Sequence, residues 1–152
     1  MKIVDGKDFI PQVKKLIVEY TERLGRDLAF QHINEELQNP ATKYTAPEGE
    51  ILVALEKNEV LGMVAYHRHN ESRCEMKRLY VRPKARGLHL GDALVKEIVS
   101  HAQQAGYKEM VLDTITPLKS AIHLYKKHGF TECKPYYDNP MDDVIYMMKK
   151  LS

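Results

Sequence analysis

The stretch of sequence that decides the fold is Leu79-Tyr80-Val81-Arg82-Pro83-Lys84-Ala85-Arg86-Gly87-Leu88-His89-Leu90-Gly91-Asp92-Ala93-Leu94. It predicts the end of a β-strand, a short turn and the start of a helix. Backbone NH groups in the first turn of a helix have no intrahelical partner and carry the positive end of the helix dipole, so a phosphate can bind there. Gly87 and Gly91 leave room for such a ligand, and Arg86 adds a charged donor that suits a pyrophosphate better than a carboxylate.

Two other interpretations of this stretch stay open. In the simpler one, Gly87 only makes a turn and Gly91 only allows close packing of the helix. In the other, the turn binds the phosphate of a different nucleotide, although the stretch lacks the lysine and the serine or threonine of a P-loop and the glycine spacing of a dinucleotide fingerprint. The spacing of two glycines does not separate these interpretations.

Three β-strands are expected before the turn, at Ile51 to Glu56, Val60 to His67 and Arg73 to Val81. The first two are typical of an antiparallel hairpin joined at Lys57-Asn58-Glu59. In the third, apolar residues occupy positions 74 and 76 but then 79 and 81, so the alternation slips by one residue. One extra residue near Lys77 to Leu79 predicts a β-bulge, which can splay a strand beside a site, although a mere scatter of apolar residues is the alternative.

The N-terminal part predicts a short strand at Ile3-Val4 and then two helices. The first helix is expected to have Asp8 as its N-cap and to stop at Gly25. The second is expected to cover Gln31 to Gln38, before a loop from Asn39 to Gly49 that contains two prolines and could border a substrate site.

After the turn, a long helix with one apolar face is expected to end at Gly106, and a strand follows at Met110 to Asp113. Thr116 and Pro117 read as the N-cap and first residue of another helix, which Gly129 ends. The last two strands are expected at Phe130 to Cys133 and Val144 to Met148. This order predicts an α/β fold of mixed α+β type, with helices on the faces of a mixed sheet.

The totals fit one domain over residues 1–152 and exclude several classes of protein. The hydrophobic share of 43% and the charged share of 29% are ordinary for a globular protein, and a formal charge of +2 does not indicate a nucleic-acid partner. The charged start and the absence of a run of ~18 apolar residues argue against a signal peptide and a membrane span, so we expect a cytoplasmic protein. The two cysteines and the scattered histidines predict no metal site.

Two segments carry a resemblance to a known family. Arg86-Gly87-Leu88-His89-Leu90-Gly91 resembles the pyrophosphate loop of the GNAT acetyltransferases, and residues 120–130, Ser120-Ala121-Ile122-His123-Leu124-Tyr125-Lys126-Lys127-His128-Gly129-Phe130, look like the C-terminal helix of that family. The chain departs from the pattern at His89, where the family has a glycine, and at Leu118, where many relatives have asparagine. The resemblance implies a central, mainly antiparallel mixed sheet with a splayed strand pair, and acetyl-CoA as cosubstrate without a metal.

The resemblance also implies which residues bind the cofactor. The pantetheine arm lies in the slot between the bulged strand and the next one, with its amides bonded to the main chain of Leu79 and Val81, and a strand NH polarises the thioester carbonyl. The implied cofactor-binding residues are Leu79, Tyr80, Val81, Arg86, Gly87, Leu88, His89, Leu90, Gly91 and Asp92.

By the same resemblance, the Tyr125 hydroxyl protonates the departing thiolate, whereas helical spacing from Leu118 and Ala121 also fits a plain core residue. A lysine-like amine must lose a proton before it attacks, and Glu75 is the candidate base, directly or through a water. The alternative for Glu75 is an exposed ion pair with Lys77, worth ~0–1 kcal/mol.

The segment Pro135-Tyr136-Tyr137-Asp138-Asn139-Pro140 resembles part of one GNAT subgroup. It makes Tyr136 and Tyr137 candidate acceptor-binding residues, although tyrosines in such a loop are as often packing residues.

These expectations describe an N-acetyltransferase that moves an acetyl group directly to a primary amine in a ternary complex. A covalent acetyl-cysteine step is not expected, because neither Cys74 nor Cys133 has a neighbouring histidine-based activation pattern. The alternative is an inactive module that binds acyl-CoA as a sensor. Small amines, amino acids, peptides and protein lysines all stay open as acceptors, and a homodimer through a sheet edge is a further hypothesis.

Overall fold

The computed structural model of the chain describes residues 1–26, 33–44 and 48–152. A seven-stranded sheet in the order β1-β2-β3-β4-β5-β7-β6 forms its centre. Among the described strands, β4 and β5 run parallel, while the other neighbouring pairs are antiparallel. The predicted mixed, mainly antiparallel sheet is therefore confirmed.

The expected strands and helices follow one another along the chain in the expected order. The strands are β1 (Lys2–Asp5), β2 (Glu50–Glu56), β3 (Glu59–Arg68), β4 (Arg73–Val81), β5 (Glu109–Ile115), β6 (Thr131–Glu132) and β7 (Val144–Lys150). The helices are η1 (Gly6–Phe9), α1 (Ile10–Leu24), α2 (Ile33–Gln38), α3 (Pro40–Lys43), η3 (Pro83–Ala85), α4 (Leu90–Gln104) and α5 (Lys119–Lys127).

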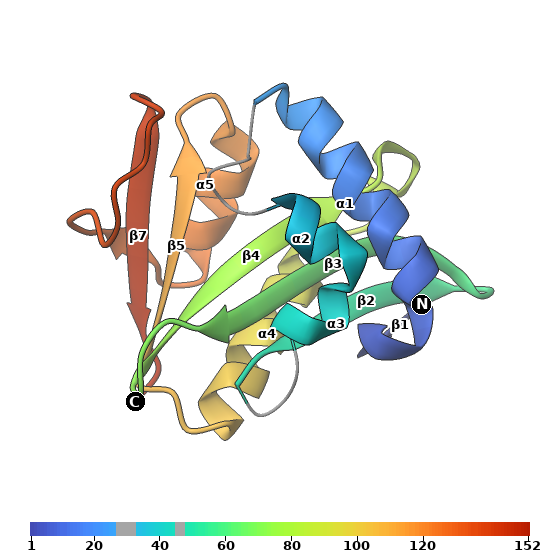
Figure 1. Cartoon of the computed structure of the whole chain (residues 1–152), viewed down its shortest axis with the longest axis horizontal. Helices are drawn as coiled ribbons and strands as arrows, with labels where there is room; N and C mark the ends of the chain where they lie inside the picture. Colours follow the sequence, from blue (N-terminus) through green and yellow to red (C-terminus); the bar gives the residue numbers. More distant parts are fainter. Residues whose placement is uncertain (27–32, 45–47) are drawn as a thin grey trace.

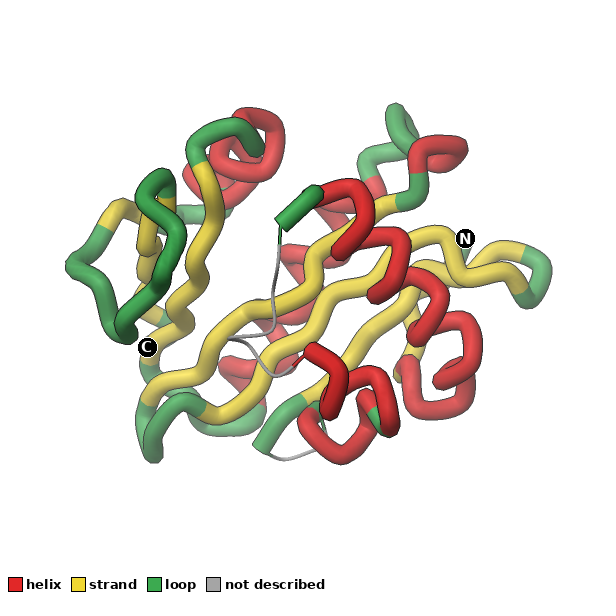
Figure 2. The backbone as a smooth tube through the Cα atoms, turned by 45° about the horizontal axis from the view of Figure 1, so that its top comes forward, coloured by secondary structure: helices red, strands yellow, loops and turns green. Residues whose placement is uncertain are grey.

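Helices cover the sheet on both faces. In Figure 1, α1, α2 and α3 lie in front of the strands and α4 lies behind them, and Figure 2 shows the strands running between the two groups. Strand β2 contributes to both cores, because successive side chains of a strand point to opposite faces. Ile51 and Val53 pack against α1, and Leu52 and Ala54 belong to the core beneath α4 and α5.

Strand β4 carries the predicted bulge. Met63 pairs with Tyr80 and Ala65 with Lys77, so the single residue between them on β3 faces two residues of β4. One of these two is Arg78, whose backbone is left-handed at φ 61°. An extra residue of this kind bends a strand and turns its side chains away from the regular alternation.

The bulge coincides with a split in the sheet. The parallel register of β4 and β5 covers residues 73–75 of β4 and ends at the pair Glu75↔Val111. Beyond that pair β4 continues to Val81 and β5 to Ile115, and Figure 1 shows the two strands diverging. The predicted splayed strand pair is present.

The expected starts of two helices were wrong. Asp8 lies inside η1, and α1 begins after Phe9, because Pro11 is accommodated in a first helical turn, where its missing NH costs nothing. Helix α5 begins at Lys119 with Leu118 as N-cap, so neither Thr116 nor Pro117 starts it. The Thr116 NH instead bonds the carbonyl of Asp143 near β7.

The expected loop from Asn39 to Gly49 contains a short helix. Pro40 opens α3, and the Asn39 side chain caps it by accepting from the Ala41 NH. Of the helix expected at 31–38, residues 31 and 32 lie outside the described residues, and α2 begins at Ile33. Within the described parts of the chain, no helix is both long and apolar enough to cross a bilayer.

Candidate active site

A cleft of about 690 Å³ opens at the end of β4, next to the split in the sheet. The residues around it come from α1, the end of β4, the loop before α4 and the start of α5. They include Tyr20, Arg23, Leu24, Leu79, Tyr80, Val81, Ala85, Arg86, Gly87, His89, Leu90, Gly91, Lys119, Ser120, Ala121 and Leu124. Eight of the ten residues expected to bind the cofactor are among them.

Arg86, Gly87 and His89 of the loop before α4 line one side of the cleft. Gly87 has φ 88°, and a Cβ at that position would meet no atom within 4 Å, so the backbone is open to a ligand there. His89 has φ 59° and ψ 27°, a left-handed conformation that glycine adopts more easily. At this position, where the resemblance leads us to expect a glycine, the histidine thus adopts a backbone conformation that favours glycine.

The cleft is positively charged. Arg23, Arg86 and Lys119 line it together with the N-terminus of α4, and among the described lining residues there is no carboxylate. Arg23 and Lys119 were missed in the sequence, because they lie on α1 and α5, far from the loop along the chain. Cations and unpaired helix NH groups together suit a ligand with several phosphate charges.

Gly91 has a packing role as well. A Cβ at this position would lie 3.2 Å from Cδ2 of Leu124 on α5, which is closer than most contacts of that kind. Gly91 therefore allows α4 and α5 to approach each other, and it still lines the cleft. The simpler interpretation, in which Gly91 allows close packing of the helix, is therefore compatible with a place for Gly91 in the lining of the cleft.

Two of the expected cofactor-binding residues lie outside the lining of the cleft. Leu88 is 56% exposed. The Asp92 carboxylate accepts from His128 Nε2 and pairs with Lys127 Nζ, both at 2.9 Å. Hydrogen bonds from Lys127 and His128 lower the pKa of Asp92, which joins the start of α4 to the end of α5.

A smaller cavity of about 70 Å³ lies between β4 and β5 beyond the split. It shares Leu79, Ala121 and other lining residues with the cleft, so the two spaces adjoin. Lys77 of β4, Asp113 of β5 and Tyr125 of α5 line this inner cavity. It places polar groups of three elements at the inner end of the cleft.

Tyr125 is the tyrosine expected to act on the thiolate. It is buried on α5, and its ring packs edge-on against Phe130 at 6.0 Å. Burial raises the pKa of Tyr125, so the hydroxyl keeps its proton and is available as a hydrogen-bond donor at neutral pH. Tyr125 is therefore a core residue, as one of its two alternatives had it, and it also lines the inner cavity.

Glu75, the expected base, lies on β4 at the last pair before the split and is buried. Its carboxylate bonds His67 Nε2 at 2.7 Å and accepts from the Tyr136 hydroxyl. Burial by itself raises the pKa of Glu75, but the hydrogen bonds from His67 and Tyr136 and the charge of Lys77 outweigh it and hold the pKa at about 2. The pairing with Lys77 is a 4.0 Å contact between two buried groups, so the expected exposed pair was wrong.

Tyr136 and Tyr137 both reach acidic groups near the split. Tyr136 donates to Glu75, and Tyr137 donates to Asp113. Their rings also pack on each other and on Tyr146, at 5.3 to 5.8 Å between centroids. The loop that carries them is therefore tied to β4 and β5 on the face covered by α1, α2 and α3.

Lys77 and Asp113 were not singled out in the sequence. Both are charged residues, and both follow the last paired residues of the only parallel pair among the described strands. Because ligands gather at the carboxyl ends of parallel strands, that combination was the available signal. Among the described residues, no group of three or more histidine, cysteine or carboxylate side chains is arranged to hold a metal.

The bulged strand and the split parallel pair, with a cationic cleft beside them, agree with the fold that the resemblance to the GNAT acetyltransferases implies. The sequence profile of the Acetyltransferase (GNAT) family matches residues 11–130. An uncharacterized N-acetyltransferase of Schizosaccharomyces pombe is 48% identical over 141 residues, which cover 91% of this chain and 86% of that protein.

Solved structures show the same fold. A GNAT-family acetyltransferase from Staphylococcus aureus Mu50 has a TM-score of 0.81 and 19% identity, with 99% of each chain covered. An aminoglycoside 6'-N-acetyltransferase complexed with coenzyme A has a TM-score of 0.75 and 15% identity, with 100% of this chain and 98% of that chain covered. The chain belongs to the GNAT family of acetyltransferases.

Proposed function

We propose that this protein is an acetyl-CoA-dependent N-acetyltransferase that moves the acetyl group to a primary amine by direct transfer in a ternary complex. The observation that carries the proposal is that the cationic cleft adjoins the inner cavity that Tyr125 lines. The cleft is suited to the phosphates of acetyl-CoA, and the cavity to its thioester. The coenzyme A complex of the aminoglycoside 6'-N-acetyltransferase, which has this fold, supports the choice of ligand.

In this proposal the N-terminus of α4, Arg86 and Lys119 hold the pyrophosphate. The main chain of Leu79 and Val81 bonds the pantetheine amides, since the parallel register with β5 ends before these residues. A strand NH polarises the thioester carbonyl, which stabilises the charge that develops on its oxygen.

Tyr125 donates its hydroxyl proton to the thiolate when the carbon–sulfur bond breaks. The amine must lose a proton, and we propose that this proton passes through a water to Glu75. A carboxylate with a pKa of about 2 does not keep a proton at neutral pH. Glu75 would therefore pass it on to solvent, while it holds His67 and Tyr136 in place.

We propose that the acceptor amine enters on the face of α1, α2 and α3, where Tyr136 and Tyr137 stand over Glu75 and Asp113. Two carboxylates attract the ammonium form of an amine, whether it belongs to a small molecule, a peptide or a protein lysine. A cytoplasmic location and a homodimer are parts of the same proposal, and sedimentation that shows only monomer would remove the second.

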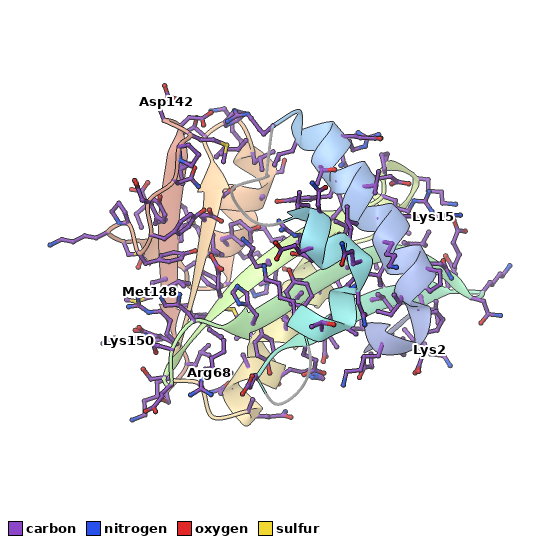
Figure 3. The ribbon with its side chains drawn as sticks, in the orientation of Figure 1. Lys2, Lys15, Arg68, Asp142, Met148 and Lys150 are labelled. Atoms are coloured by element: carbon purple, nitrogen blue, oxygen red, sulfur yellow. The ribbon has the colours of Figure 1, made fainter. Side chains whose placement is uncertain are left out.

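A thermal-unfolding titration tests the cofactor part of the proposal. Acetyl-CoA at ~100 times its Kd stabilises the folded protein by about 2.7 kcal/mol, so acetyl-CoA and CoA should raise Tm and ATP should raise it little. Arg86→Ala should reduce the shift. The matched control is Arg68→Ala, since Arg68 lies at the opposite end of β3 from the cleft (Figure 3). No shift at saturating acetyl-CoA would remove the proposal.

Release of CoA thiol with a panel of amines then tests turnover. Tyr125→Phe should lower the rate of release by about 100-fold, because phenylalanine cannot donate a proton. Its control is Tyr107→Phe, which removes another buried hydroxyl, bonded to the carbonyl of Glu48. If the wild type binds acetyl-CoA and releases no thiol with any amine, the chain is the sensor module instead.

A further inference from the structure

Lys77 is a buried amine that the proposed transfer does not use. It lies on β4, two residues beyond the last pair of β4 with β5, and its side chain is only 7% exposed. It lines the inner cavity between the two strands. A lysine this deeply buried is unusual unless its ammonium group is paired.

The pairing of Lys77 is incomplete. The closest carboxylate oxygen is Oε1 of Glu75 at 4.0 Å, which is beyond hydrogen-bond distance. In the part of the chain that the structure describes, Nζ has no hydrogen-bond partner, and its contact with Glu75 is long. Lys77 also borders the inner cavity.

The surroundings of Nζ lower the pKa of Lys77. Burial lowers the pKa of Lys77, and the positive charges of Arg78 and Lys43 act in the same direction. Glu75 on the same strand and Asp113 on β5 act in the opposite direction without cancelling the effect of burial. A larger fraction of Lys77 is neutral, and so nucleophilic, than of an exposed lysine.

The inner cavity also brings Lys77 close to the proposed reaction. If the Tyr125 hydroxyl bonds the thioester sulfur, the carbonyl carbon is one covalent bond away from that sulfur. Lys77 and Tyr125 line the same cavity of about 70 Å³, so amine and carbonyl carbon would share a small space. Positioning of this kind strongly accelerates a reaction between two groups.

We propose that the protein acetylates itself on Lys77 when no acceptor amine is present, an inference that rests on the proposed function. The Lys77 ammonium first loses a proton to solvent. Nζ then forms a bond to the carbonyl carbon of acetyl-CoA, the carbon–sulfur bond breaks, and the thiolate takes the Tyr125 proton to leave as CoA thiol. The second amine proton goes to solvent and reprotonates Tyr125, leaving Lys77 as a neutral amide.

This modification would switch the site off. The added acetyl group occupies the inner cavity, which has little room beyond it, and the positive charge next to Glu75 is lost. A molecule modified in this way keeps the cationic cleft but has no space for the thioester. Self-acetylation thus limits the activity of the enzyme when acetyl-CoA is abundant and the acceptor is scarce.

The test is incubation of the whole protein with acetyl-CoA and no amine, followed by intact mass and peptide mapping. We expect one added acetyl group on Lys77, in a first-order reaction whose rate constant does not change with protein concentration. Lys77→Arg should lose this modification, and Lys15→Arg should keep it, because Lys15 is an exposed lysine on α1 (Figure 3). If Lys77→Arg does not fold, Tyr125→Phe gives the second test, with modification of Lys77 slowed by about 100-fold.

Acetyl phosphate serves as the comparison donor, because it carries the acetyl group without the part that fills the cleft. It should modify exposed lysines such as Lys15 and leave Lys77 unchanged. Modification of Lys77 by both donors at equal rates, or no modification of Lys77 by acetyl-CoA, would overturn the inference. A thermal shift with acetyl-CoA alongside an unmodified Lys77 overturns the inference alone, whereas the loss of both removes the proposed function as well.

Discussion

At the scale of single residues, Glu75 shows how partners rather than burial decide the charge of a side chain. Burial favours the neutral acid, yet two hydrogen bonds and a nearby lysine keep the carboxylate ionised. Of these partners, Lys77 alone is close in sequence, two residues after Glu75. His67 comes from the neighbouring strand and Tyr136 from the loop before β7.

The low pKa of Glu75 has a consequence for stability. Its pKa falls from 4.5 in the unfolded chain to about 2 in the folded protein, so the ionised form is stabilised by folding. That contribution, of roughly 3 kcal/mol, is complete above pH ~4.5 and disappears as the pH falls toward 2.

Urea unfolding of the wild type and Glu75→Gln over this pH range measures the effect. The wild type should be more stable than the variant at pH 7, and the difference should shrink as the pH falls through 4.5 toward 2. The control is Glu71→Gln, at an exposed position in the loop between β3 and β4. A difference that does not vary with pH would contradict the assignment of a low pKa to Glu75.

His89 carries a conformational cost that can be measured. A left-handed backbone costs a non-glycine residue roughly 1 kcal/mol, and His89 has this conformation at φ 59°. His89→Gly should therefore raise the free energy of unfolding by about 1 kcal/mol without loss of the acetyl-CoA shift. If instead the variant is less stable, the imidazole makes a contact worth more than the backbone strain.

At the scale of elements, a buried ion pair joins α2 to the bulge of β4. Arg78 Nε and Glu36 Oε2 lie 2.9 Å apart, and both side chains are almost fully buried. A second bond from the same guanidinium to Oε1 measures 3.1 Å. The bulge thus directs an arginine into the layer of α2, where a regular strand would have placed a different side chain.

Removing one partner of this pair should be costly. Glu36→Gln removes the negative charge that is hydrogen-bonded to the buried Arg78 guanidinium, for which we expect a loss of roughly 3–5 kcal/mol in the free energy of unfolding. Chemical denaturation checks the value, with Glu22→Gln on the exposed side of α1 as control. A loss as small as that of the control would mean that the pair does not hold α2 to the sheet.

At the scale of the whole molecule, one sheet is shared by two cores. Leu52 and Ala54 belong to one core and Ile51 and Val53 to the other, so β2 links the two cores. We therefore propose that residues 1–152 behave as one domain.

Calorimetry tests this proposal. We expect a single unfolding transition in which the calorimetric and van't Hoff enthalpies agree. Acetyl-CoA should move the whole transition, because its cleft draws on α1, β4, α4 and α5 together. Two transitions, of which acetyl-CoA moves only one, would divide the chain into separate units.

The sequence by itself determined the features whose causes are local. The strand, turn and helix from residues 79–94 are contiguous, and the backbone geometry at Gly87 depends on residues within a few positions. The bulge was predictable for the same reason, since the slip in the alternation of apolar residues lies within a single strand. The mixed sheet followed from the order of the elements.

Only the tertiary structure decided what surrounds the site. Arg23 and Lys119 reach the cleft from elements about a hundred residues apart, and Glu75 gains its charge from partners on β3 and near β7. The burial of Lys77 depends on the way β4 and β5 separate. Electric charge and burial act through space and not along the chain, so residue types could suggest a site for acetyl transfer, but only packing could set the charge and burial of its side chains.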